Sequence, residues 1–281
     1  MKLLSGTKKQ KWVQLATAGI LLLAVVSGLV MASGAEGRQL VKNLDIRITP
    51  DSGMYFITPQ DVVQALAPDG SAYMGKTVAS LHLDRLEAKM QEHPFVAACE
   101  VHADLSGNIQ VRIRQKNVLL RIINKTGQSF YLDETGQKLP FSNKFTPNVP
   151  VASGNIEEQL QDSAYPKTPV LQQLQQLAVY LNKNPMWAAQ IEQVYVDNFS
   201  ELLLIPRVGN HSIVLGTCEQ LEEKMEKLRI FYTKALPSVG WDSYSKINLS
   251  YRGQVVATRR DAASTSSDLN EGQNNEQNTG Q

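Results

Sequence analysis

The chain has 281 residues, of which 42% are hydrophobic and 20% are charged, and this composition excludes a wholly disordered protein. Its 28 basic and 27 acidic residues give a formal net charge of +1, without the basic excess that a general nucleic-acid binder needs. Two cysteines are too few for a disulfide-dense scaffold or for a four-cysteine zinc site.

The N-terminal segment predicts a single membrane anchor. Residues 1–11 hold four lysines and no acid, and the segment from Trp12 to Ala32 contains no charged side chain. A helix over residues 12–32 spans roughly 30 Å, the thickness of the hydrocarbon core of a bilayer. By the positive-inside rule, residues 1–11 stay in the cytoplasm and the body of the chain lies outside the cytoplasmic membrane. A cleaved signal peptide, with a small-residue site at residues 33–35, stays open as the alternative.

After a linker at residues 33–39, residues 40–116 predict a unit with the order strand, helix, helix, strand, strand. Thr58 followed by a proline is a helix start, with the threonine as N-cap. A second helix is expected to begin near Asp84, with Glu87 three residues later as in a capping box. Period-two alternation of apolar residues marks the three strands. Two helices are therefore expected on one face of a three-stranded sheet.

Residues 117–260 predict a second domain that is rich in strands, with an antiparallel sheet and helices. Short apolar runs suitable for strands recur along it, and helical spacing follows Thr168 and Gln220. Residues 261–281 carry four acids, no lysine or arginine, and one large aliphatic residue, so this tail is expected to be disordered. The predicted fold class is α+β, in the order anchor, first unit, β-rich domain and tail.

A hairpin is predicted at the end of the second domain. Apolar residues at 247, 249 and 251 alternate with polar ones, which indicates a strand that reaches Tyr251. Arg252-Gly253 turns the chain into a last strand over residues 254–258. A last strand followed by a disordered tail is expected at a sheet edge, where unpaired backbone groups accept another strand. From position alone, a core aromatic of the hairpin is the favoured interpretation of Tyr251.

The two cysteines permit a Cys99–Cys218 disulfide in an oxidising compartment. Cys99 alternates with apolar residues as on the inner face of a strand, and Cys218 falls at helical spacing with Leu221 and Met225. We therefore interpret both as small buried hydrophobic residues.

The sequence carries no recognisable catalytic set. It has no phosphate-binding loop, dinucleotide-binding glycine motif, nucleophile elbow or zinc-protease helix. None of the four histidines pairs with another at metal-ligand spacing; they are His82, His93, His102 and His211. We predict no catalytic residue, no cofactor or metal, and no small-molecule substrate. A membrane-anchored extracytoplasmic cell-wall enzyme remains an alternative, because catalytic residues can be scattered along a chain.

The order of motifs resembles the FtsQ/DivIB family of bacterial cell-division proteins, and the first unit resembles a POTRA (polypeptide-transport-associated) domain. The resemblance runs from about Leu3 to Arg260. It is carried mainly by residues 56–62 (FITPQDV), 93–96 (HPFV), 111–116 (VRIRQK), 130–136 (FYLDETG), 214–216 (VLG) and 247–251 (INLSY). A POTRA-containing factor of outer-membrane assembly or secretion is the rival that shares the first unit alone.

The resemblance implies a non-enzymatic, single-pass divisome scaffold in the inner membrane, enriched at the division septum, with its bulk in the periplasm. Its partners would be FtsB (DivIC), FtsL and other divisome proteins, and the last β strand would pair with a strand of FtsB. The resemblance also implies that Tyr251, in a Leu-x-Tyr motif, makes the central contact with FtsB. Ser250 stands where the family has arginine. The candidate partner-binding residues are Leu249, Ser250, Tyr251, Arg252, Gly253, Gln254, Val255, Val256 and Ala257.

Overall fold

The computed structural model describes residues 21–23, 27, 39–49, 55–68, 70 and 72–260, and the chain divides into two compact units after Gln115. The predicted transmembrane segment from Trp12 to Ala32, except residues 21–23 and 27, and the predicted disordered tail at 261–281 lie outside the described residues. None of the helices in the described part is both long enough and apolar enough to cross a membrane.

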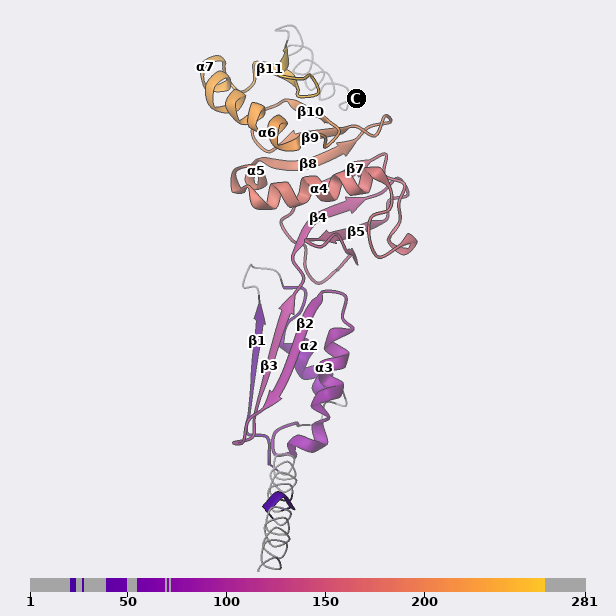
Figure 1. The fold of residues 1–281 in the computed structure, drawn as a ribbon, viewed down its shortest axis with the longest axis vertical. Coiled ribbons are helices and arrows are strands. Elements are labelled where there is room, and N and C mark those ends of the chain that lie inside the picture. Colours follow the sequence, from indigo (N-terminus) through magenta and orange to yellow (C-terminus); the bar gives the residue numbers. More distant parts are fainter. Residues whose placement is uncertain are drawn as a thin grey trace, which may run out of the picture. The chain divides into compact units, whose positions relative to one another are not determined.

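The first unit has the predicted order of elements. Its sheet has the strand order β1-β3-β2, with β1 parallel and β2 antiparallel to the central β3. Helices α2 and α3 lie together on one face of this sheet (Figure 1). The elements are β1 (Asn43–Thr49), α2 (Pro59–Leu66), the 3-10 turn η2 (Val78–Leu81), α3 (Leu83–Gln91), β2 (Val96–Ala103) and β3 (Asn108–Gln115).

Both predicted helix starts are confirmed, but the capping box predicted for the second helix is wrong. Thr58 caps α2: its hydroxyl accepts the Asp61 N–H, and the Asp61 carboxylate accepts the Thr58 N–H. Helix α3 has no capping box, because its N-cap residue, His82, is left-handed with φ 47° and makes no side-chain cap. Glu87 instead accepts the backbone N–H of Val101 at 3.2 Å, and so ties α3 to β2.

The second unit is built on a nine-stranded sheet with the order β12-β11-β10-β9-β8-β7-β4-β5-β6. The expectation of an antiparallel sheet is only partly right, because the pairs β4–β7, β7–β8 and β10–β11 run parallel. Its strands are β4 (Val118–Ile123), β5 (Ser129–Asp133), β6 (Lys138–Pro140), β7 (Val151–Gly154), β8 (Ile191–Val196), β9 (Leu202–Pro206), β10 (Ser212–Gly216), β11 (Tyr244–Asn248) and β12 (Val256–Arg259).

Helical connections account for two of the parallel pairs. Helices α4 (Pro169–Lys183) and α5 (Pro185–Gln190) link β7 to β8, after the 3-10 turn η3 (Leu160–Asp162). Helix α6 (Leu221–Ile230), the π-helical turn η4 (Phe231–Ala235) and α7 (Leu236–Val239) link β10 to β11. Such crossovers return the chain in the same direction. Their apolar faces join the sheet in one core, which includes Leu174, Leu177, Met225, Leu228 and Tyr232.

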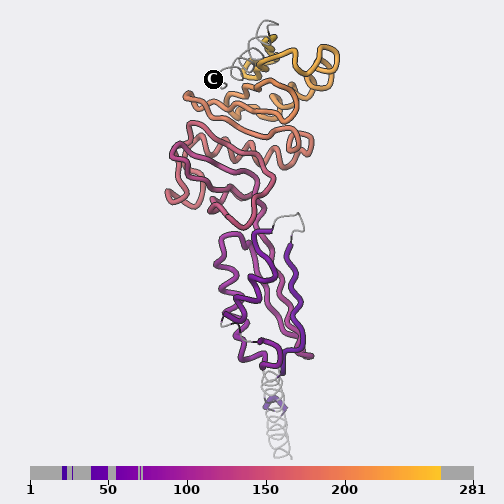
Figure 2. Tube along the Cα trace, turned by 180° about the vertical axis from the view of Figure 1, so that it is seen from behind, coloured from indigo at the N-terminus to yellow at the C-terminus, as the bar shows by residue number. Residues whose placement is uncertain are grey.

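The strands of the second unit follow one another in space almost in chain order. In Figure 2 the colours of this unit run from magenta at one end of the sheet to yellow at the other. This arrangement places the last strand, β12, at one edge and the short β6 at the opposite edge.

Both cysteines are free and buried, in agreement with their interpretation as small hydrophobic residues. Cys99 lies on β2 of the first unit, and Cys218 precedes α6 in the second. Burial, reinforced by the charges of Glu87 and Glu100, raises the pKa of the Cys99 thiol to about 11. Burial raises the pKa of Cys218 to about 12, against the opposing effect of Lys224.

Candidate partner-binding edge

Strand β12 is paired on one side. It runs antiparallel to β11, with Ile247 opposite Ala257 and Asn248 opposite Val256. Within the residues that the structure describes, no strand pairs with its other side. An edge of this kind presents a row of N–H and C=O groups that can bond to an added strand.

The opposite edge of the same sheet is closed. Strand β6 has three residues and ends in Pro140, and the N–H of Lys138 donates to the Ala164 carbonyl oxygen at 2.8 Å. The Nζ of Lys138 lies 2.8 Å from a carboxylate oxygen of Glu158, and these side chains are 0% and 2% exposed. A short, proline-bearing strand covered by a loop resists pairing with other chains. Of the two edges, β12 is therefore the one open to a partner.

The predicted strand through Tyr251 is wrong, because β11 ends at Asn248 and residues 249–255 form a loop. The side-chain oxygen of Asn248 accepts the N–H of Ser250 at 2.8 Å, a local bond that competes with the strand ladder. The Leu249 N–H donates to the Val214 carbonyl oxygen of β10 at 2.9 Å, and the Leu249 side chain is fully buried. Leu249 is thus a core residue that fixes the start of the loop.

Tyr251 is half exposed, with 50% of its surface accessible, so it is not a core aromatic of the hairpin. The Nζ of Lys227 on α6 donates to the Tyr251 carbonyl oxygen at 3.2 Å. Lys227 also lies 3.7 Å from the carboxylate of Glu223, one helical turn earlier. The helix therefore holds the backbone of the loop while the tyrosine ring is left accessible.

An apolar groove of about 250 Å³ lies between this loop and the helix. Its walls come from α6, η4 and the loop, and they consist of Lys227, Ile230, Phe231, Lys234, Ala235, Gly253, Gln254 and Val255. Val255 and Phe231 also pack against the core, whereas Ile230 is 49% exposed. The groove gives the edge a place for an apolar side chain.

Sequence reasoning missed the helical half of this groove. Leu221, Met225 and Leu228 form the buried stripe of α6, so Ile230 falls outside the stripe and projects toward solvent. A large apolar residue off the buried face of an amphipathic helix is the signal that marks such a surface.

The other predicted partner-binding residues are distributed along the loop and β12. Ser250, Arg252, Gly253 and Gln254 are exposed in the loop. Val256 is 41% exposed on β12, and Ala257 beside it is partly buried. The structure brings residues 249–257 together at one end of one sheet.

The edge is positively charged. Residues 244–260, which contain β11, the loop and β12, hold four cations and no acid; the cations are Lys246, Arg252, Arg259 and Arg260. Lys234 adds another at the groove, where Lys227 is paired with Glu223. A partner segment that carries carboxylates would complement this charge.

The histidines do not form a metal site. Within the described residues, no group of three or more histidines, cysteines, aspartates or glutamates is placed to hold a metal ion. His82, His93 and His102 belong to the first unit and are not buried. His211 is buried, with Nε2 at 2.7 Å from the hydroxyl of Tyr232, and burial lowers its pKa.

Two families match the chain. The family described as FtsQ/DivIB, C-terminal related, matches residues 118–258, half of the chain, and this stretch includes β6, the groove and all of β12 except Arg259. A POTRA-like domain matches residues 39–114, the first unit. No curated protein matches the chain. The chain therefore belongs to the FtsQ/DivIB family of cell-division proteins.

Proposed function

We propose that this protein is a non-catalytic divisome scaffold that binds the FtsB (DivIC)–FtsL pair through β12 and the loop before it. The family supports a scaffold role in cell division. The observation that carries the partner-binding proposal is the edge strand β12, open on one side in the described part of the chain and flanked by the accessible Tyr251.

In this proposal a partner strand extends the nine-stranded sheet beyond β12. Main-chain hydrogen bonds would supply much of the affinity, and side chains at alternate positions would supply specificity. The half-exposed Tyr251 offers a large apolar ring with a polar hydroxyl, a combination that suits an interface anchor. The groove beside Ile230 would take an apolar partner side chain, and the surrounding cations would attract an acidic segment.

We also propose that the protein is single-pass, with residues 1–11 in the cytoplasm, an anchor over residues 12–32, and both units in the periplasm. Charge supports this topology, because the basic cluster lies on one side of the uncharged segment. Enrichment at the division septum belongs to the same proposal.

Affinity capture of the full-length protein from membranes tests the proposal. The wild type is expected to bring the FtsB–FtsL pair with it, and Tyr251→Ala is expected to weaken capture at least tenfold. Tyr195→Ala is the matched control, because Tyr195 is 47% exposed on the interior strand β8 of the same sheet. Wild-type capture by a folded Tyr251→Ala protein would overturn the assignment of this residue.

A further inference from the structure

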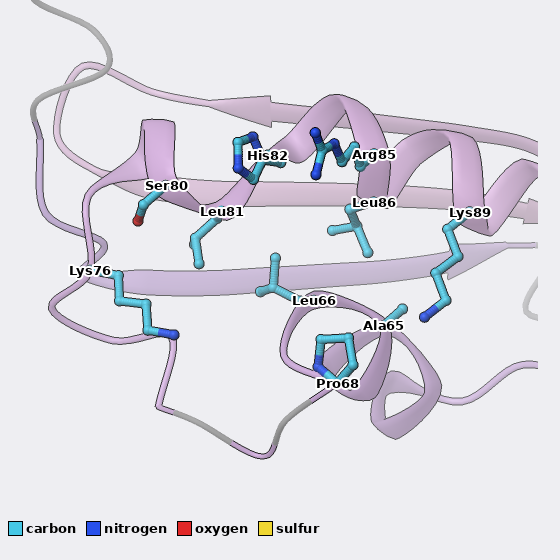
Figure 3. A pocket seen from close by; sticks show the side chains of 10 residues that line it. All are labelled: Ala65, Leu66, Pro68, Lys76, Ser80, Leu81, His82, Arg85, Leu86 and Lys89. Carbon is cyan, nitrogen blue, oxygen red and sulfur yellow. The ribbon is translucent and has the colours of Figure 1, made fainter.

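A second surface in the first unit carries a distinct chemistry. A cavity of about 460 Å³ opens between α2, η2 and α3. Figure 3 shows Lys76 at one end of this cavity and Lys89 at the other, with Leu66, Leu81 and Leu86 between them. Arg85 comes from the same helix as Lys89, one turn earlier. The cavity therefore has an apolar floor and cations along its rim.

Two of the rim cations, Arg85 and Lys89, form no ion pair in the part of the chain that the structure describes. Among the described residues that line the cavity there is no carboxylate. The N-terminus of α3 lies at the cavity, because its N-cap residue, His82, is one of the lining residues. The His82 side chain does not cap the helix. The positive end of the helix adds to the field of Arg85 and Lys89. Such a cavity selects an anion that also carries apolar groups.

The cavity lies close in the chain to the predicted membrane anchor. The main-chain carbonyl oxygen of Lys76 accepts a hydrogen bond from the Val41 N–H, and the Val78 N–H donates to the carbonyl oxygen of Gln39. Residues 39–41 lie at the end of the predicted linker (residues 33–39) and directly after it. Seven linker residues reach at most about 25 Å. This end of the first unit therefore stays within that distance of the proposed membrane surface.

The same end of the unit exposes large apolar side chains. Leu40, Met74 and Leu105 are 54%, 51% and 73% exposed. Backbone hydrogen bonds hold the segments of these residues together. The Gly75 N–H donates to the Val41 carbonyl oxygen, and the Lys42 N–H donates to the carbonyl oxygen of Gly107, in the turn beside Leu105. The turn approaches so closely that a Cβ on Gly107, whose φ is +87°, would lie 2.2 Å from the Leu40 carbonyl oxygen. Exposed apolar residues beside lysines are typical of a surface that rests on a membrane.

We propose that the cavity between α2 and α3 binds the phosphate headgroup of an anionic phospholipid, with Arg85 and Lys89 as its cations. Leu40, Met74 and Leu105 then rest in the interfacial region of the bilayer. This inference rests on the proposed membrane topology and is independent of the β12 edge, which lies in the other unit. It gives the first unit a second attachment to the membrane besides the anchor.

Native mass spectrometry of the full-length protein in detergent tests the proposal. Phosphatidylglycerol and phosphatidylcholine of equal chain length are added in parallel, and the lipid retained per protein is measured. The wild type is expected to retain phosphatidylglycerol preferentially, and the double variant Arg85→Gln/Lys89→Gln is expected to retain about tenfold less. The control Arg112→Gln/Arg114→Gln removes two cations from β3 of the same unit, outside the cavity, and is expected to behave as the wild type.

Three results would overturn the proposal. One is equal retention of phosphatidylglycerol by the cavity variant and the wild type. Another is equal retention of both lipids by the wild type, because the cavity is assigned to an anionic headgroup. The third is displacement of the lipid by soluble glycerol phosphate at the same concentration, which would assign the site to a free anion. Capture of the FtsB–FtsL pair by the cavity variant is expected to be unchanged, so failure of either proposal is separable from the other.

Discussion

The Nζ of Lys227 donates a hydrogen bond of 3.2 Å to the main-chain carbonyl oxygen of Tyr251, and this bond joins helix α6 to the loop before the edge strand. The Tyr251 ring takes no part in it and remains half exposed. Helix α6 thus fixes the backbone of the loop, while the side chain of Tyr251 stays accessible to solvent. Fixing a loop before binding lowers the entropy cost of association.

Replacement of Lys227 by methionine is expected to weaken partner binding without unfolding the protein. The variant keeps the aliphatic stem of the side chain but loses the hydrogen bond to the loop, so capture of the FtsB–FtsL pair is expected to fall about threefold to tenfold. Lys183→Met, an exposed lysine at the end of α4, is the control. Equal affinities for both variants, measured by titration of the purified pair, would show that the bond does not position the loop.

Proline substitution distinguishes the two sides of β12. Successive residues of a strand direct their N–H groups to opposite edges, so Val256→Pro and Ala257→Pro remove one amide from each side in turn. One variant is expected to abolish capture while its melting temperature stays near that of the wild type. The other is expected to lose the pairing with β11 and therefore stability. Retention of capture by both folded variants would contradict strand addition at this edge.

The buried Lys138–Glu158 pair predicts a loss of stability in acid. Burial alone would raise the pKa of Glu158, but hydrogen bonds from Lys138, Thr168 and Lys167 outweigh it and hold the pKa below its ordinary value of 4.5. The stabilisation by this carboxylate is therefore complete above about pH 4.5 and is lost as the pH falls through its lower, folded-state pKa.

The variant Glu158→Gln tests this assignment. It leaves the buried Lys138 without its counter-charge, so the free energy of unfolding at pH 7 is expected to fall by about 3 kcal/mol, and its acid dependence is expected to flatten. The adjacent Glu157 pairs with Lys125 at the surface, where the two side chains are 75% and 49% exposed. Glu157→Gln is expected to change stability by less than about 1 kcal/mol. Similar losses for both variants in chemical denaturation would refute the assignment.

The two thiols are expected to resist alkylation in the folded protein. Both are buried, and their raised pKa values leave almost no thiolate at pH 8. Iodoacetamide is expected to modify both only after unfolding, whereas a cysteine placed at the exposed Ser106 turn reacts at once. Reaction of native Cys99 or Cys218 at the rate of the Ser106→Cys thiol would mean that β2 or the turn before α6 opens readily.

Local signals in the sequence were sufficient for the order of strands and helices in the first unit, but not for all of its contacts. Thr58 and its proline predicted the start of α2, and alternation predicted the three strands, because each signal is set by neighbours within a few residues. Glu87 was assigned wrongly because its backbone partner, Val101, lies 14 residues away on another element. A capping pattern does not reveal such a competing partner.

The sequence predicted where in the chain the candidate site lies, but not the conformation of its backbone. The resemblance and the alternation of residues 247–251 located the hairpin, yet the strand was expected to continue through Tyr251. Asn248, which ends β11 with a side-chain bond to Ser250, was the local signal against it. The groove depends on Ile230, Phe231 and Val255 lining the same space, and this arrangement has no counterpart in the local pattern.

Hydrogen exchange at β12, with and without the FtsB–FtsL pair, tests the central claim most directly. Addition of a partner strand would bond the outward amides of Val256–Arg259, so their exchange is expected to slow strongly on binding. The amides of β6, at the closed edge, serve as the internal control and are expected to be unchanged. Binding of the pair with unaltered exchange across β12 would contradict the account.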